Sequence, residues 1–181
     1  MSRRIASSHD SVVLQAERDI RARLSDHELD FSAMSAVSNI YRTGSAVRNH
    51  MEREVLGDYD LSWVAFTVLW VLWIWGEQET GHVAAEAGIT KGTLTGVMKT
   101  LQARKLIRRI PHRDDRRRVS IGLSKAGQRL IERVFPEFNG HETLAVSALS
   151  AGDQQELARL LRLVLQTISD TDESDGSPHL T

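Results

Sequence analysis

Basic side chains crowd into one stretch of this 181-residue sequence. From Lys91 to Arg118, ten basic residues stand against two acidic ones, which gives a net charge of +8. The whole chain carries a formal net charge of −1, so the residues outside this stretch have a net charge of −9. A solvated surface usually mixes both signs, whereas one positive face on an acidic protein is typical of binding to a polyanion such as nucleic acid.

A helix is predicted at the start of this basic stretch, over about Lys91–Arg104. Its apolar residues share one stripe with helical spacing, namely Leu94, Val97, Met98 and Leu101. Thr90 is placed to cap the helix, because its hydroxyl can accept a hydrogen bond from a first-turn N–H group. Gly92 and Gly96 lie opposite the stripe, where they either let a partner approach the backbone closely or are simply tolerated at the surface.

A short helix and a β-hairpin are predicted on either side of this helix. The short helix covers His82–Ala87 and is joined to it by a glycine-containing turn, which is the helix-turn-helix pattern. Val119–Leu123 alternates apolar residues with small or polar ones, as a half-buried strand does. Leu106–Ile110 alternates poorly, but the charged loop Pro111–Arg118 follows it, so we expect a hairpin with that loop at its tip.

Further helices are predicted on both sides of this central region. Apolar periodicity places them at about Ser11–Leu24, Phe31 or Ser35 to Val55, Leu61–Trp75, Lys125–Leu149 and Asp153–Ser169. Asp60 or Ser62 is expected to cap the third of them. Ser124 is expected to cap the fourth, and Pro136 to kink or break it, because proline lacks a backbone donor. The predicted divisions are N-terminal helices (1–60), a nucleic-acid-binding domain (61–123), C-terminal helices (124–169) and a disordered acidic tail (170–181).

The helix Leu61–Trp75 is apolar on nearly every side and is therefore expected to be buried. Its tryptophans are most simply core residues. Alternatively, part of the helix walls a pocket for an aromatic ligand, since such pockets are mostly apolar with a few polar groups. The residues that would line this pocket are Tyr41, Arg42, His50, Trp63, Phe66 and Trp70.

Several functional classes are disfavoured by what the sequence lacks. It contains no cysteine, which excludes disulfides, thiolate metal sites and thiol redox sensing. Its seven histidines are scattered without a ligand spacing, and no catalytic or nucleotide-binding motif is present, so we expect no metal, no cofactor and no enzyme. The basic start lacks the apolar core of an export signal, and no apolar run is long enough to span a bilayer, which indicates a cytoplasmic protein without a membrane partner.

The hairpin and the helix after it carry a sequence motif. Six further residues separate Asp115-Arg116-Arg117 from Ser124, and Gly127 completes the run LSKAG. This pattern resembles the D-R-R…L-T-x-x-G motif of the multiple antibiotic resistance regulator (MarR) family. Serine replaces the usual threonine and keeps the capping hydroxyl. The resemblance covers roughly Leu61–Ile168.

The resemblance implies a mainly α fold with a small β-hairpin wing. In that fold a winged helix-turn-helix lies between long N- and C-terminal helices that build a homodimer. Ser11–Leu24 resembles an N-terminal extension found in some branches of the family, including urate-responsive ones. No acid stands in the middle of Leu61–Trp75, where that branch has one, so no urate site is expected.

Contacts to double-stranded DNA also follow from the resemblance. The helix at about Lys91–Arg104 would occupy the major groove, and Asp115 would orient Arg117 of the wing into a minor groove, whose negative potential attracts arginine. An exposed ion pair is the simpler alternative for Asp115 and Arg117. The predicted contacts are Thr93, Thr95 and Lys99 to base edges or phosphates, Arg108, Arg109 and Arg113 to phosphates, and in addition Lys91, Asp115, Arg116 and Arg117.

Two such units related by a two-fold axis would bind a pseudo-palindromic operator with half-sites about one helical turn apart. The sequence therefore predicts a homodimeric, sequence-specific transcriptional regulator, a repressor that a small aromatic ligand releases from DNA. A sequence-indifferent architectural DNA-binding protein is the alternative. Salt dependence does not separate the two, because both would bind DNA less tightly as salt rises.

Overall fold

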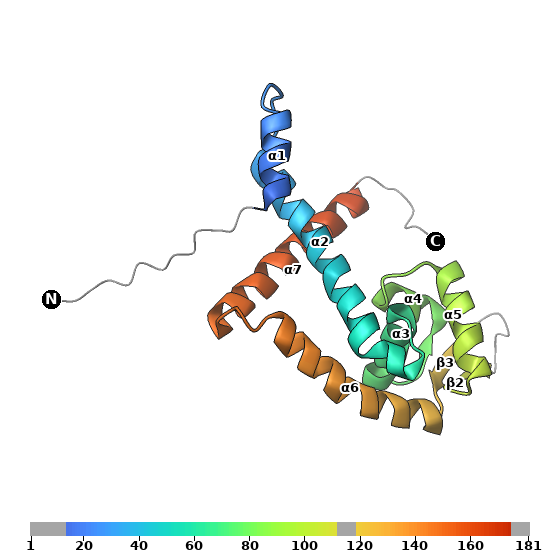
Figure 1. The fold of residues 1–181 in the computed structure, drawn as a ribbon. Coiled ribbons are helices and arrows are strands. Elements are labelled where there is room, and N and C mark those ends of the chain that lie inside the picture. The colour runs from blue at the N-terminus through green and yellow to red at the C-terminus, as the bar shows by residue number, and fades with distance from the viewer. Residues whose placement is uncertain (1–13, 112–118, 175–181) are drawn as a thin grey trace. The chain divides into compact units, whose positions relative to one another are not determined.

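The computed structural model describes residues 14–111 and 119–174, and Figure 1 labels the helices α1 to α7 and the strands β2 and β3. In chain order these are α1 (Gln15–Arg23), α2 (Phe31–Glu54), the 3₁₀ turn η1 (Leu56–Tyr59), α3 (Trp63–Trp75), β1 (Gln78–Glu79), α4 (Thr80–Glu86), α5 (Lys91–Ala103), β2 (Ile107–Pro111), β3 (Val119–Leu123), α6 (Lys125–Ala145) and α7 (Ala151–Ser174). The chain divides into two compact units, Met1–Ala46 and Val47–Thr181, and α2 contributes to both.

The predicted fold class, mainly helical with a small β-hairpin, is confirmed. β2 and β3 pair antiparallel, with Ile107 opposite Leu123 at one end and Pro111 opposite Val119 at the other. The poorly alternating segment is therefore the first strand of the hairpin. β1 pairs with the other edge of β3, which gives the strand order β1-β3-β2. The predicted wing loop, residues 112–118, lies outside the described residues.

The core of the second unit forms around α3, which contacts α4, α5, α6 and β3 (Figure 1). The buried residues of α3 are Ala65, Phe66, Val68, Leu69, Val71 and Leu72, as expected for a helix that is apolar on nearly every side. Ile74 and Trp75 at its C-terminal end are exposed. Of the two predicted caps, Ser62 is the one used, because its hydroxyl accepts a hydrogen bond from the N–H of Ala65 at 3.2 Å.

α6 continues through Pro136 without interruption, so the predicted break at this residue is wrong. Proline inside a helix removes one backbone hydrogen bond and its ring clashes with the preceding turn, which together cost about 3 kcal/mol. Packing against α3 compensates for that loss, since Val134 and Phe138 on either side are buried and Phe138 stacks on Phe66 with ring centroids 4.1 Å apart. Burying one such side chain contributes about 1.5–3 kcal/mol. The helix then ends at Ala145, earlier than predicted.

α7 extends to Ser174, so the part of the predicted disordered tail from Asp170 to Ser174 is helical instead. Its start is capped by Ser150, whose hydroxyl accepts from the N–H of Asp153 at 3.2 Å, while the Asp153 carboxylate accepts from the N–H of Ser150 at 3.1 Å. An established helix adds one hydrogen bond for each further residue, so a polar end can continue it. Residues 175–181 lie outside the described residues.

The first unit consists of α1 and the N-terminal part of α2. Asn39 donates to the Glu17 carboxylate at 2.6 Å, and the guanidinium of Arg21 lies 5.3 Å from the ring centroid of Phe31. These contacts hold α1 against α2. Among residues 14–111 and 119–174, no helix combines the length and the apolar character needed to cross a membrane.

Candidate nucleic-acid interface

α5 presents one face to the core and the other to solvent, as its sequence predicts. Leu94, Met98 and Leu101 are buried beneath it. Thr90 caps the helix by accepting from the N–H of Thr93 at 3.1 Å, and the two threonine hydroxyls are 3.0 Å apart. The cap and the apolar stripe together determine which side chains of α5 point outward.

Four of the predicted contact residues line one hollow beside α5. Lys91, Thr95 and Lys99 come from α5, and Arg109 comes from β2. The hollow has a volume of about 510 Å³, and we call it the α5 hollow. Apolar side chains also line it, namely Leu94, Met98 and Val119. Three cationic groups therefore gather around a concave surface on one side of an exposed helix.

Gly92 and Gly96 leave part of the solvent-facing surface of α5 without side chains. A Cβ atom added to Gly96 would meet nothing within 4 Å, and one added to Gly92 would meet only the hydroxyl of Thr90 at 3.8 Å. Packing inside the described part of the chain therefore requires neither glycine. Both of the explanations offered by the sequence, close approach of a partner and simple tolerance at the surface, agree with this geometry.

The hydroxyl of Thr95 has its proton engaged within the helix. Its Oγ1 donates to the backbone carbonyl of Lys91 at 2.9 Å. A hydroxyl carries one proton and two lone pairs, so Thr95 can still accept a hydrogen bond from outside. In the major groove the groups that donate are the amino groups of adenine and cytosine.

The two adjacent arginines of β2 point to opposite sides of the strand. Side chains alternate along a strand, so Arg109 lines the α5 hollow while Arg108 points the other way. The guanidinium of Arg108 pairs with the Glu77 carboxylate, and its Nε donates to the carbonyl of Leu123 at 3.3 Å. A phosphate contact by Arg108 remains a prediction. The other predicted wing contacts, Arg113, Asp115, Arg116 and Arg117, lie outside the described residues.

Comparison with known proteins identifies this helix-turn-helix and hairpin. A sequence model of the MarR family matches residues 61–119. The HTH-type transcriptional regulator YwaE of Bacillus subtilis is 37% identical over 143 residues, which cover 79% of this chain and 84% of YwaE. The chain belongs to the MarR family. It is a winged-helix, DNA-binding transcriptional regulator, and such regulators are not enzymes.

Solved MarR-type structures have the same fold. Sco3205 of Streptomyces coelicolor, a MarR family regulator solved in complex with DNA, superposes with a TM-score of 0.72 at 19% identity and covers 78% of this chain and 90% of its own. BpsR of Bordetella bronchiseptica, whose DNA binding is regulated by 6-hydroxynicotinic acid, gives a TM-score of 0.67 at 24% identity over 71% of this chain and 97% of its own. At these identities the likeness shows the fold.

The structure explains two residues of the MarR motif. Ser124 caps α6 by accepting from the N–H groups of Ala126 and Gly127 at 3.1 and 3.0 Å, and its hydroxyl donates to the carbonyl of Lys105 at 2.6 Å. Gly127 lies directly on the backbone before β2, where an added Cβ atom would stand 2.0 Å from the carbonyl oxygen of Leu106. Both residues thus hold the start of α6 against the wing sheet of this MarR protein.

Arg104, at the C-terminal end of α5, has a positioning role that the sequence did not reveal. Its guanidinium donates to the carbonyl oxygen of Tyr59 at 2.8 Å and to that of Asp60. These two acceptors belong to η1 and the residue after it, and the bond to Tyr59 spans 45 residues of sequence. No local pattern signals such a contact. It ties the end of the MarR helix α5 to the turn between α2 and α3.

The ligand pocket predicted from six residues remains a prediction. Tyr41 and Arg42 belong to the first unit, whereas the other four belong to the second. Tyr41 is exposed, and Arg42 lines a hollow of only about 20 Å³ beside α1. His50 Nε2 lies 2.9 Å from His141 Nδ1. Trp63 and Phe66 pack on Phe138, and Trp70 packs edge-on against Trp75.

Among the described residues, no group of three or more His, Cys, Asp or Glu side chains is arranged to hold a metal ion.

Proposed function

We propose that this MarR-family protein is a homodimeric repressor that binds a pseudo-palindromic operator through α5 and the wing, and that a small molecule releases it from DNA. The observation that carries the proposal is the α5 hollow. It brings Lys91, Lys99 and Arg109 together beside an exposed face of α5, where a Cβ atom added to Gly96 would meet nothing within 4 Å. An α-helix fits the width of the major groove of B-DNA.

The side chains around the hollow suit two kinds of contact. Lys91, Lys99 and Arg109 would neutralise phosphates, which supplies affinity and positions the protein without reading the sequence. Thr95, with its proton committed to the backbone, would accept a hydrogen bond from an adenine or cytosine amino group. The first kind of contact makes the binding salt-dependent, and the second makes it sequence-specific.

The apolar surface of α7 supports the homodimer. Six large side chains with helical spacing are between 36% and 66% exposed, namely Leu157, Leu160, Leu161, Val164, Leu165 and Ile168. A contiguous apolar stripe of this kind is unfavourable in water, and full burial would contribute about 1.5–3 kcal/mol for each side chain. A second copy of the chain presents the same stripe and can cover it in a two-fold arrangement.

Control by a small molecule is supported by BpsR, whose DNA binding is regulated by 6-hydroxynicotinic acid. A ligand can release DNA only if it binds the free conformation more tightly than the DNA-bound one. The predicted aromatic pocket at Tyr41, Arg42, His50, Trp63, Phe66 and Trp70 is one place for such a ligand. The candidate effectors are aromatic acids.

The test is a competition binding assay between the DNA upstream of the protein's own gene and random DNA of equal length. We expect at least about a thousandfold preference for one upstream segment, as for other specific binders. A preference below about tenfold would contradict the proposal and favour an architectural DNA-binding protein. Light scattering on the same sample tests the dimer, and adding aromatic acids to the complex tests release.

A further inference from the structure

Glu77 and Arg108 form an ion pair that crosses the three-stranded sheet β1-β3-β2. Gly122 of β3 lies opposite Arg108 of β2. On the other edge of β3, the β1 ladder pairs Gln78 with Ile121. Continued by one residue, this register places Glu77 opposite Gly122. Residues directly opposite one another in an antiparallel sheet share a face, so Glu77, Gly122 and Arg108 form one row with the glycine in the middle.

The missing side chain of Gly122 makes this ion pair possible. Neighbouring strands lie about 4.8 Å apart, so a side chain beside β1 must cross β3 to reach β2. The side chain of Glu77 crosses directly over Gly122, where an added Cβ atom would stand 2.9 Å from the Cγ atom of Glu77. The Glu77 carboxylate accepts from the guanidinium of Arg108, whose Nε also donates to the carbonyl of Leu123 at 3.3 Å.

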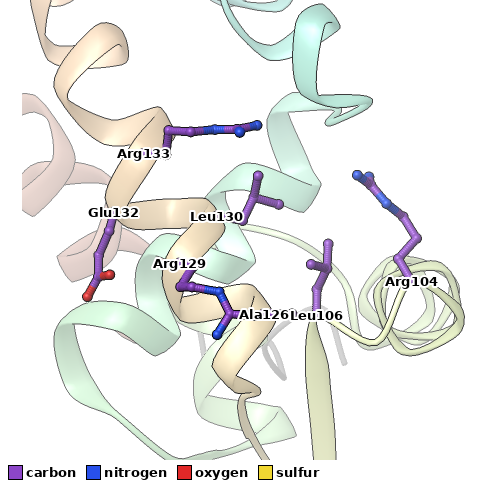
Figure 2. A pocket seen from close by; sticks show the side chains of 7 residues that line it. All are labelled: Arg104, Leu106, Ala126, Arg129, Leu130, Glu132 and Arg133. Atoms are coloured by element: carbon purple, nitrogen blue, oxygen red, sulfur yellow. The ribbon is translucent and has the colours of Figure 1, made fainter.

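The β2–β3 hairpin is held from two sides. On one side Leu106, just before β2, is buried and lies beside Ala126 and Leu130 of α6 (Figure 2). On the other side the ladder between β1 and β3 consists of two residue pairs. The Glu77–Arg108 pair adds a direct link between β1 and β2, which are not neighbours in the sheet. Because Glu77 follows two residues after the end of α3, this link connects β2 to the central helix of the core.

We propose that Glu77 is a positioning residue for DNA binding. The Glu77–Arg108 pair fixes the angle at which the hairpin leaves the core, and the guanidinium of Arg108 serves this purpose and not a phosphate contact. Arg109, the next residue, points to the other side of the strand and lines the α5 hollow. The proposal rests on the proposed function, because it takes α5 and the wing as the DNA-binding surface. A phosphate contact by Arg108 leads to different expectations.

The size of the effect follows from the exposure of the pair. The side chains of Arg108 and Glu77 are 58% and 49% exposed, and an exposed ion pair shifts an equilibrium by up to about fivefold. The apparent affinity for DNA falls in proportion to the population of the binding-competent hairpin position. Loss of the pair should therefore weaken DNA binding by no more than about fivefold, and the number of phosphate contacts should stay the same.

The experiment measures the affinity of the full-length protein for its preferred segment of the DNA upstream of its own gene, at several salt concentrations. Gly122→Ala removes the pair without changing any charge, because the new methyl group occupies the path of the Glu77 side chain. We expect binding about two- to fivefold weaker, with the slope of log affinity against log salt unchanged within about half a unit. Gly140→Ala is the matched control, since an added Cβ atom there meets nothing within 4 Å, and it should change the affinity by less than about twofold.

Variants of the two arginines separate positioning from a phosphate contact. Arg108→Ala should weaken binding by about the same factor as Gly122→Ala, and both changes together should weaken it no further, because either one removes the whole pair. Arg109→Ala removes an arginine from the opposite side of the same strand and should lower the salt slope by about one, whereas Arg108→Ala should not. Glu77→Arg combined with Arg108→Glu keeps the net charge and reverses the pair, so the affinity should return to within about twofold of the wild type.

Melting temperatures without DNA test the geometry of the row independently. Gly122→Ala should be less favourable in the wild type than in a Glu77→Ala variant, because alanine at position 77 has no Cγ atom to collide with the new methyl group. The two changes in melting temperature should differ by about 1–4 °C.

Several results would overturn the positioning role: unchanged DNA affinity in Gly122→Ala, a salt slope that falls by about one in Arg108→Ala, additive losses from these two changes, or no recovery in the variant with the reversed pair. Equal changes in melting temperature in the two backgrounds would overturn the pair itself. If the wild type prefers no upstream segment, the proposed function fails and the positioning role fails with it, while the melting temperatures still decide whether Glu77 crosses over Gly122. Specific binding that is indifferent to Gly122→Ala would overturn the positioning role alone.

Discussion

Replacing Gly127 with alanine tests how closely α6 must approach the wing sheet, and two effects oppose each other. Alanine is more favourable than glycine inside a helix by about 1 kcal/mol. However, the new Cβ atom would stand 2.0 Å from the carbonyl oxygen of Leu106, whereas ordinary contact begins at 3.4 Å. Because the obstacle is backbone, no side chain can turn aside. The start of α6 must therefore move away from β2 by about 1 Å.

That movement stretches two hydrogen bonds across the same junction. The N–H of Ser124 donates to the carbonyl of Leu106 at 2.9 Å, and the Ser124 hydroxyl donates to the carbonyl of Lys105 at 2.6 Å. Each bond is worth about 1 kcal/mol net. Forcing an extra methyl group into a packed junction costs a further 1–3 kcal/mol or so. After the gain in helix propensity is subtracted, Gly127→Ala should lower the free energy of unfolding by about 2–4 kcal/mol.

Gly140→Ala is the matched control, because Gly140 lies on the same helix and an added Cβ atom there meets nothing within 4 Å. This substitution should raise the free energy of unfolding by about 0.5–1 kcal/mol. The assay is urea denaturation of both variants at one protein concentration, since the stability of an oligomer depends on concentration. A Gly127→Ala variant as stable as the wild type, or more stable, would refute the reasoning.

Three further predictions concern single side chains. Ser124→Ala should lower the free energy of unfolding by about 1 kcal/mol in urea denaturation, while Ser124→Thr, which keeps a capping hydroxyl, should lose much less. Leu161→Asp places a charge in the apolar stripe of α7 and should yield a monomer in light scattering; a persistent dimer would place the interface elsewhere. Tyr59 donates to the Glu137 carboxylate at 2.9 Å, and this bond is the main reason that the pKa of its phenol is raised. The bond exists only while the phenol is protonated, so its contribution is complete below about pH 10 and is lost as the pH rises through the raised pKa. Tyr59→Phe should therefore be less stable than the wild type at neutral pH, and that difference should disappear in strongly alkaline solution.

Features that depend on neighbours in the chain could be predicted from the sequence. The apolar stripe under α5 and the caps Thr90 and Ser124 involve residues within a few positions of one another, so their spacing alone reveals them. The same holds for the charge of the stretch Lys91–Arg118 and for the motif that resembled the MarR family. The family match, residues 61–119, contains the whole of that stretch. The fold class followed from these local patterns.

Only the tertiary structure decided the features whose partners are distant in the chain. Pro136 does not end α6, because the side chains beside it pack on α3, about 70 residues earlier. Arg104 and Arg108 look alike in the sequence, yet one is bound by carbonyls 44 and 45 residues away and the other by a carboxylate 31 residues away. Hydrogen bonds and packing between distant segments depend on how the chain folds back. The spacing of residue types along the sequence does not indicate which distant segments come into contact. The sequence determined which side chains carry charge, and the fold determined which of those charges remain available to a ligand.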